Sequence, residues 1–166
     1  MPAEPDLVGV CRSLNAAGAH YLVIGGFAVI AHQHVRATED SDLLVPVDDA
    51  NVDALAAALA DLDAVVTATG SAPTRVLLAE AAHIRLDTRA GLVDLLREGD
   101  PPLDFESGFA DRLTVILDDV EIPVAGLALL ATLKRVAGRL RDRADLEELE
   151  RIHGELPSLP LPDPDL

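Results

Sequence analysis

Two carboxylates lie close together in the first third of the chain. Asp40 and Asp42 are two residues apart at the start of an apolar segment, Leu43-Leu44-Val45-Pro46-Val47. A strand places residues i and i+2 on one face, so both carboxylates point the same way. They repel each other unless a cation lies between them, and Mg²⁺ with nucleotide phosphates is the natural one. Asp61 and Asp63 share this spacing, so the context, not the spacing, singles out the first pair.

A third carboxylate interrupts a later apolar strand. Asp94 stands in Leu92-Val93-Asp94-Leu95-Leu96, where an unpaired buried charge would be costly. Such a residue has a catalytic or metal-binding role, or it takes part in a buried ion pair. The residues alone leave both interpretations open.

A glycine pair precedes the first carboxylates. Gly25 and Gly26 follow the apolar run Tyr21-Leu22-Val23-Ile24 and precede a helical pattern. Because glycine has no Cβ, the backbone N–H groups of such a turn can approach a phosphate closely. A tight strand-to-helix turn without a ligand explains the same pattern.

Basic residues gather in one later segment. Five of the thirteen Lys and Arg residues fall between Lys134 and Arg143, and Lys134 is the only lysine of the chain. A solvated helix end with ordinary ion pairs would account for the cluster. A single lysine among arginines also suggests a position where a compact ammonium contacts a phosphate.

The elements that must position these groups follow from periodicity and turn signals. Helices are predicted over 6–17, 27–34, 127–137 and 142–153. One more helix is predicted to begin after a cap at Asp48 or Asp49. Strands are predicted over 21–24, 42–47, 64–68, 83–87, 92–96, 114–117 and 120–124, with tight turns at 88–91 and 118–119. Segment 74–80 fits helix and strand equally. This order predicts an α+β (mixed α/β) domain over residues 1–156. The tail 157–166 holds four of the eleven prolines and is expected to be disordered.

Composition limits the classes of partner. The 166 residues carry 13 Lys and Arg against 29 Asp and Glu, a formal charge of -16, with 2% aromatic residues. This excludes broad non-specific nucleic-acid binding and base stacking on an aromatic platform. The single cysteine excludes an internal disulfide, and the sequence shows neither a signal peptide nor an apolar run long enough to cross a membrane. A soluble cytoplasmic protein is expected.

Three segments together resemble a known superfamily. Leu22-Val23-Ile24-Gly25-Gly26-Phe27-Ala28, Arg36-Ala37-Thr38 and Asp40-Ser41-Asp42 resemble the signature of the DNA polymerase β-like nucleotidyltransferases. Val93-Asp94-Leu95-Leu96 stands at the usual place of the third carboxylate. The stretch from Leu133 to Leu146 is similar to the Lys-x-x-Ala-Gly-Arg-x-x-Asp-x-x-Asp stretch of AbiEii-type toxins, within the minimal nucleotidyltransferase branch. Ser41 replaces the apolar residue usual between the two acids, a change expected to be minor at a solvent-tolerant position.

The resemblance implies a fold, a reaction and roles for named residues. The fold is a small mixed β-sheet flanked by helices, with further helices at the C-terminal end. The reaction is Mg²⁺-dependent transfer of a nucleoside monophosphate from an NTP to an acceptor, catalysed mainly by positioning and electrostatics. The resemblance implies that a pair of Mg²⁺ ions is bound by Asp40, Asp42 and Asp94, and that the triphosphate is held by Gly25, Gly26 and Thr38. It also implies phosphate contacts from Lys134, Arg36 and Arg139. Asp142 or Asp145 would orient Lys134 or Arg139.

Neither the residues nor the resemblance identifies the acceptor. Related toxins use RNA, typically a tRNA 3′ end, which suggests the toxin of a toxin–antitoxin pair with an antitoxin protein as partner, and a protein acceptor is equally compatible. The alternative is a small cationic acceptor such as an aminoglycoside, which the charge of -16 favours. A third hypothesis is a non-catalytic member of the fold that binds a nucleotide or a partner.

Overall fold

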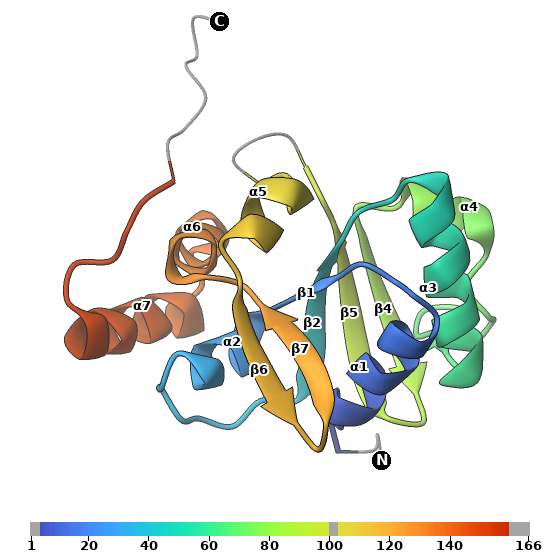
Figure 1. The fold of residues 1–166 in the computed structure, drawn as a ribbon, viewed down its shortest axis with the longest axis horizontal. Coiled ribbons are helices and arrows are strands. Elements are labelled where there is room, and N and C mark those ends of the chain that lie inside the picture. The colour runs from blue at the N-terminus through green and yellow to red at the C-terminus, as the bar shows by residue number, and fades with distance from the viewer. Residues whose placement is uncertain (1–3, 100–102, 160–166) are drawn as a thin grey trace, which may run out of the picture.

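The computed structural model describes residues 4–99 and 103–159. Its strands form one sheet in the order β3-β4-β5-β2-β1-β7-β6, and Figure 1 shows this sheet between two groups of helices. The strands are β1 (Leu22–Ile24), β2 (Asp40–Val45), β3 (Val65–Val66), β4 (His83–Thr88), β5 (Gly91–Arg97), β6 (Leu113–Leu117) and β7 (Val120–Val124). Strand β2 runs parallel to β5 and β7 runs parallel to β1, whereas the other neighbours are antiparallel. The sheet is therefore mixed, as predicted.

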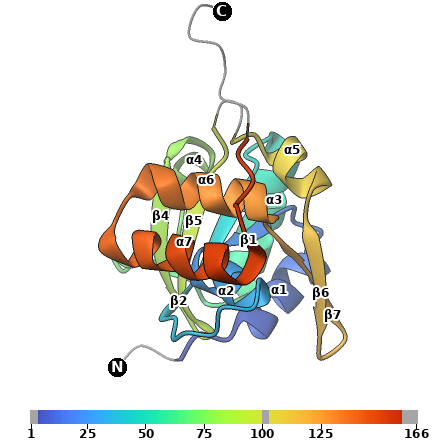
Figure 2. The same cartoon turned by 90° about the vertical axis from the view of Figure 1, so that its left-hand side faces the viewer.

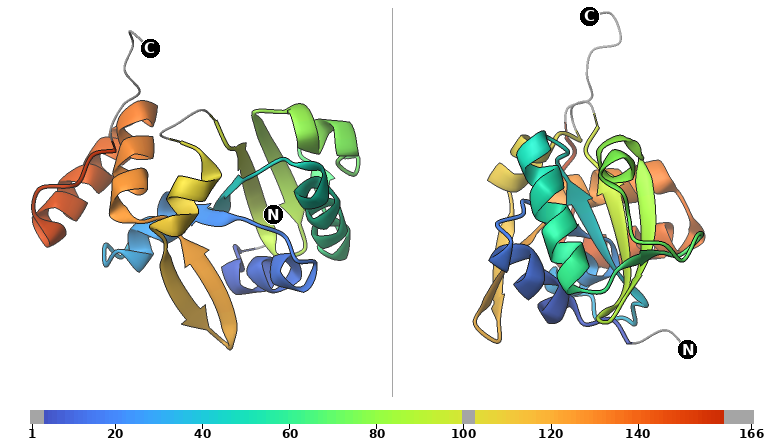
Figure 3. Two further views of the ribbon diagram at one scale, coloured as in Figure 1. Left: turned by 45° about the horizontal axis from the view of Figure 1, so that its top comes forward. Right: turned by 90° about the vertical axis from the view of Figure 1, so that its right-hand side faces the viewer.

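The helices cover both faces of this sheet. They are α1 (Leu7–Ala16), α2 (Gly25–Ala31), α3 (Asp49–Asp61), α4 (Arg75–Glu80), α5 (Phe105–Ala110), α6 (Leu127–Ala137) and α7 (Leu140–His153). Figure 2 shows α6 and α7 in front of one face, with α2 beside them, and the right-hand view of Figure 3 shows α1 and α3 against the other. Because β1, β2 and β5 are covered on both sides, their apolar residues form a continuous core.

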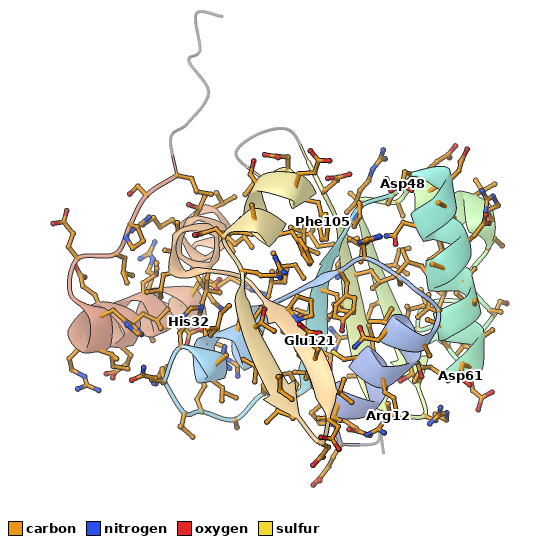
Figure 4. The ribbon with its side chains drawn as sticks, viewed as in Figure 1. Arg12, His32, Asp48, Asp61, Phe105 and Glu121 are labelled. Atoms are coloured by element: carbon orange, nitrogen blue, oxygen red, sulfur yellow. The ribbon has the colours of Figure 1, made fainter. Side chains whose placement is uncertain are left out.

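One asparagine fixes the ends of three elements. Asn51, which is 2% exposed, accepts a hydrogen bond from the backbone N–H of His20 (2.7 Å) and donates to the carbonyl oxygens of His20 (3.1 Å) and Pro46 (2.7 Å). Asp48 caps α3 by accepting from the Asn51 N–H, and Figure 4 shows Asp48 at the start of this helix and Asp61 at its other end. The chain is thus tied together where it enters β1 and leaves β2.

The predicted elements are confirmed with shifts at their ends. Helix α2 begins at Gly25 instead of Phe27, β2 spans Asp40–Val45 instead of 42–47, and β3 keeps only two residues of 64–68. The ambiguous segment 74–80 is helical because the Thr74 hydroxyl accepts a hydrogen bond from the Leu77 N–H (3.1 Å) and caps α4. Helix α5 was not predicted.

The predicted C-terminal boundary falls just after α7. Residues 157–159 lie outside helices and strands, and Arg135 donates hydrogen bonds to the Pro157 carbonyl (3.3 Å) and the Ser158 hydroxyl (3.4 Å). The rest of the predicted tail, 160–166, lies outside the described residues. No helix within residues 4–99 and 103–159 has the length and apolarity that a membrane span requires.

Candidate active site

Strand register brings the three predicted carboxylates together. Asp42 of β2 stands opposite Asp94 of β5 in the parallel pair, and Asp40 lies two residues before Asp42 on the same face. One carboxylate oxygen from each residue lies within 4.8 Å of the others. The cluster therefore consists of groups from two adjacent, centrally placed strands.

Two further residues of this cluster come from β4 and were not predicted from the sequence. Arg85 stands opposite Asp94 in the antiparallel pair, and its Nη1 lies 2.9 Å from Asp94 Oδ2 and 3.4 Å from Asp40 Oδ2. His83 Nε2 lies 2.9 Å from Asp94 Oδ1. Both oxygens of Asp94 are thus bonded to side chains of β4. Asp94 therefore forms an ion pair and also belongs to the acidic cluster, so the two interpretations of this residue are compatible with each other.

Burial and mutual repulsion make the cluster electrostatically unfavourable without a cation. Burial is the largest cause that raises the pKa of Asp42, to about 7, and the charges of Asp40 and Asp94 add to it while Lys134 opposes it. The pKa of Asp40 is also raised, by burial first and then by its contact with Asp94, against the opposing charge of Arg85. A divalent cation would relieve this repulsion.

This donor set fits Mg²⁺. Three carboxylates that converge from two strands supply the hard oxygen ligands that Mg²⁺ prefers, and they leave room for phosphate oxygens and water in its octahedral shell. Their oxygens converge within 4.8 Å although burial and like charge both oppose ionisation there.

The glycine pair lies directly beside the carboxylates. Gly25 has φ +66°, in the left-handed region, and a Cβ there would collide with the carboxylate of Asp42. A Cβ on Gly26 would lie 2.6 Å from the Thr38 hydroxyl and 3.1 Å from Arg36 Nη1. The space that a side chain would fill is therefore occupied by the predicted site residues themselves, which requires glycine at both positions.

The only lysine lies in a buried network between α6 and α7. Lys134 is 6% exposed, and its Nζ lies 3.1 Å from Asp142 and 2.9 Å from Asp145. Asp145 also accepts two hydrogen bonds from Arg36 (2.8 and 3.0 Å). Asp142 accepts hydrogen bonds from the Arg139 side chain (2.8 and 3.5 Å) and from its backbone N–H (3.1 Å). The predicted pairing of Asp142 and Asp145 with these cations is present. The ammonium that was expected to contact phosphate is already held by two carboxylates.

One cavity of about 510 Å³ unites these groups. Every predicted site residue except Asp145 lines it, and so do His83 and Arg85. The sheet supplies one wall with the carboxylates, and α6 with the start of α7 supplies the opposite wall. The volume lies in the range of roughly 300–1,000 Å³ that small-molecule sites occupy.

Solved structures resemble this fold over most of the chain. The antibiotic-resistance factor ANT(2'')-Ia in complex with adenylyl-2''-tobramycin aligns with a TM-score of 0.57 at 12% identity, over 87% of this chain and 87% of the other. An antigenic nucleotidyltransferase-like protein from Paracoccidioides brasiliensis aligns with a TM-score of 0.59 at 18% identity, over 92% and 78%. A nucleotidyltransferase described as putative, from Thermotoga maritima, gives 0.52 at 12% identity, over 86% and 88%.

Sequence comparison narrows the relationship. No curated protein matches the chain. The family model described as Aminoglycoside-2''-adenylyltransferase matches residues 6–98, which include Asp40, Asp42 and Asp94 and make up more than half of the chain. The predicted nucleotidyltransferase fold and enzyme class are thereby confirmed, whereas the AbiEii branch is not. The chain belongs to the aminoglycoside-2''-adenylyltransferase family.

Proposed function

We propose that the protein transfers a nucleoside monophosphate from an NTP to a hydroxyl group of a small cationic molecule of the aminoglycoside class. The observation that carries the proposal is the convergence of Asp40, Asp42 and Asp94 within 4.8 Å beside a cavity of about 510 Å³, in a chain whose family is that of aminoglycoside adenylyltransferases. The formal charge of -16 favours a cationic acceptor over a polyanion.

The reaction forms one P–O bond and breaks another. The acceptor hydroxyl oxygen attacks the α-phosphorus, the bond to the β-phosphate oxygen breaks, and pyrophosphate leaves. Asp94 takes up the hydroxyl proton, and His83 and Arg85 hold its two oxygens in place. Asp40, Asp42 and Asp94 would hold Mg²⁺, which when bound would supply neutralisation of the negative charge on the phosphates.

The remaining residues position the nucleotide. The backbone of Gly25 and Gly26, with the Thr38 hydroxyl, supports the triphosphate from the cavity wall. The missing side chains let Asp42 and Thr38 pack against this turn. Arg36 and Arg139 line the same cavity and offer guanidinium groups to phosphate oxygens. Lys134 acts as a positioning residue that holds α6 and α7 together through Asp142 and Asp145.

The basic cluster gives less support to an RNA acceptor than its composition suggested. Lys134 is buried, and both Arg36 and Arg139 are paired with carboxylates. The lysine that was expected to contact phosphate is therefore not available to a polyanionic tRNA end. A tRNA acceptor, a protein acceptor and a toxin–antitoxin role remain outcomes of the test.

The test is a transfer assay with separate acceptors. Purified protein, Mg²⁺ and each common NTP labelled at the α-phosphate are incubated with an aminoglycoside panel, total tRNA or protein. We expect label on an aminoglycoside and its loss in Asp42→Asn, whereas Asp61→Asn, an exposed acid outside the cavity, keeps the activity. Label on tRNA or protein alone would identify that molecule, and not an aminoglycoside, as the acceptor. Nucleotide binding without any transfer would favour the non-catalytic hypothesis.

A further inference from the structure

Strand β6 is an open edge of the sheet. It ends the strand order and is paired only with β7 among the described residues. Figure 2 shows the β6–β7 hairpin standing at the border of the molecule, away from α6 and α7. The other edge is short, because β3 has two residues. The two edges of the sheet thus differ in how much unpaired backbone they present.

The open edge lacks the usual protection against pairing. Residues 113–117, Leu-Thr-Val-Ile-Leu, include no charge and no proline, whereas exposed edges normally carry such residues. Ile116 is 69% exposed, Leu117 46% and Leu113 38%. An apolar, uncharged edge strand of this kind is open to pairing with another strand.

The hairpin turn fixes which backbone groups face outward. Asp118 and Asp119 both have positive φ (49° and 61°) and form a two-residue turn, so the flanking pair Leu117 and Val120 is hydrogen-bonded. Hydrogen-bonded and non-hydrogen-bonded residue pairs alternate along an antiparallel ladder. The N–H and C=O groups of Thr114 and Ile116 therefore point away from β7.

The strand is complementary to itself. When two copies run antiparallel with Val115 opposite Val115, Thr114 of each lies opposite Ile116 of the other, where their outward backbone groups can bond. Leu113 then lies opposite Leu117, which pairs exposed apolar side chains. The same register sets Arg112 opposite Asp118, a pair of opposite charge at each end.

We propose that β6 pairs with β6 of a second copy of this chain, with Val115 on the two-fold axis, to form a homodimer with one continuous sheet. A second copy is the occupant because antiparallel pairing about a two-fold axis requires the self-complementary pattern that this strand has. Strands β7 and β1 separate β6 from β2, so the dimer leaves the carboxylate cluster and its cavity open.

Sedimentation velocity between about 1 and 100 µM tests the association. We expect a reversible monomer–dimer equilibrium that Ile116→Lys weakens by about tenfold or more. Val76→Lys, which replaces a side chain of similar exposure (64%) on α4, leaves the equilibrium unchanged. A monomeric wild type over this range, or a dimer that Ile116→Lys does not weaken, would overturn the proposal. Slow amide exchange at Thr114 and Ile116 in a monomer would assign the edge to another occupant.

Engineered cysteines test the register independently. The native Cys11 is buried and is the single cysteine, so the background of cross-linking is low. In the proposed register the two Val115 residues form a non-hydrogen-bonded antiparallel pair. Such a pair brings the two Cα atoms to about 4.5 Å, a distance that a disulfide can bridge. Val115→Cys is therefore expected to form disulfide-linked dimers under mild oxidation. Thr114→Cys, whose partner is Ile116, should form far fewer. Equal cross-linking of the two variants, or none in either, refutes this register.

Discussion

Replacement of Lys134 by methionine should destabilise the protein through the carboxylates that it leaves behind. Asp142 and Asp145 are each 1% exposed and would lose the ammonium that lies 3.1 and 2.9 Å away. Removal of one partner of a buried ion pair costs roughly 3–5 kcal/mol. Because Asp142 keeps Arg139 and Asp145 keeps Arg36, we expect a loss of about 3 kcal/mol at neutral pH, the low end of this range.

The loss should shrink in acid. Burial alone would raise the pKa of Asp142, but hydrogen bonds from Arg139 and Lys134 and the charge of Lys134 lower it below its ordinary value. A lowered folded-state pKa gives stability that is present above the unfolded pKa and lost as pH falls through the folded one. The wild type therefore loses this contribution below about pH 4, and the difference between wild type and Lys134→Met narrows there.

Urea unfolding at a series of pH values measures this effect. Arg151→Met is the matched control, because Arg151 is 70% exposed and its pair with Glu148 lies within one helix; a change within about 0.5 kcal/mol is expected. A loss below about 1 kcal/mol for Lys134→Met at neutral pH would refute the reasoning. It would mean that the two arginines suffice to compensate the buried carboxylates.

Three other predictions concern the sheet and the glycine turn. Asp42→Asn should stabilise the metal-free protein by about 1 kcal/mol or more near pH 8, because a carboxylate whose pKa is raised to about 7 destabilises the fold when it is charged. Urea unfolding of both proteins in a chelator at a series of rising pH values measures this difference. A variant less stable than the wild type near pH 8 would contradict the prediction. Ser41→Ala should raise the midpoint of thermal unfolding by an amount equivalent to about 1 kcal/mol, since the Ser41 hydroxyl is fully buried and has no hydrogen-bond partner among the described residues; a lower midpoint would reveal a missing partner. Gly25→Ala should abolish nucleotidyl transfer whereas Gly18→Ala, also at positive φ but with open space around it, should keep it; equal losses in the transfer assay would attribute the effect to backbone strain alone.

The sequence predicted the carboxylate cluster better than the groups around it. Asp40, Asp42 and Asp94 interrupt or precede apolar strands, a local signal that a single sequence carries. Arg85 could have been found as well. The turn at Arg89 and Ala90 was predicted, and counting back from the Thr88–Gly91 pair places Arg85 opposite Asp94. The pairing of two strands, rather than any motif, reveals this residue.

The role of Lys134 depended on packing that the sequence does not show. Its place in an apolar helix and its being the only lysine suggested a phosphate contact. The structure packs α7 against α6 and brings two buried carboxylates to the ammonium. Ser41 shows the same limit, because the residue expected to tolerate solvent is fully buried on the central strand β2. Asp142 lies only eight residues after Lys134, but periodicity shows neither that α7 packs back against α6 nor that β2 is covered at Ser41.

The two walls of the cavity come from different parts of the chain. The carboxylate wall belongs to residues 6–98, the part that the family model matches, whereas the opposite wall belongs to α6 and α7. Substitutions on the exposed cavity side of α6 and α7, such as at Arg141, can therefore alter what fits between the walls without moving the strands that hold Asp42 and Asp94. The wall that carries the carboxylates and the wall formed by α6 and α7 can therefore change at different rates in evolution.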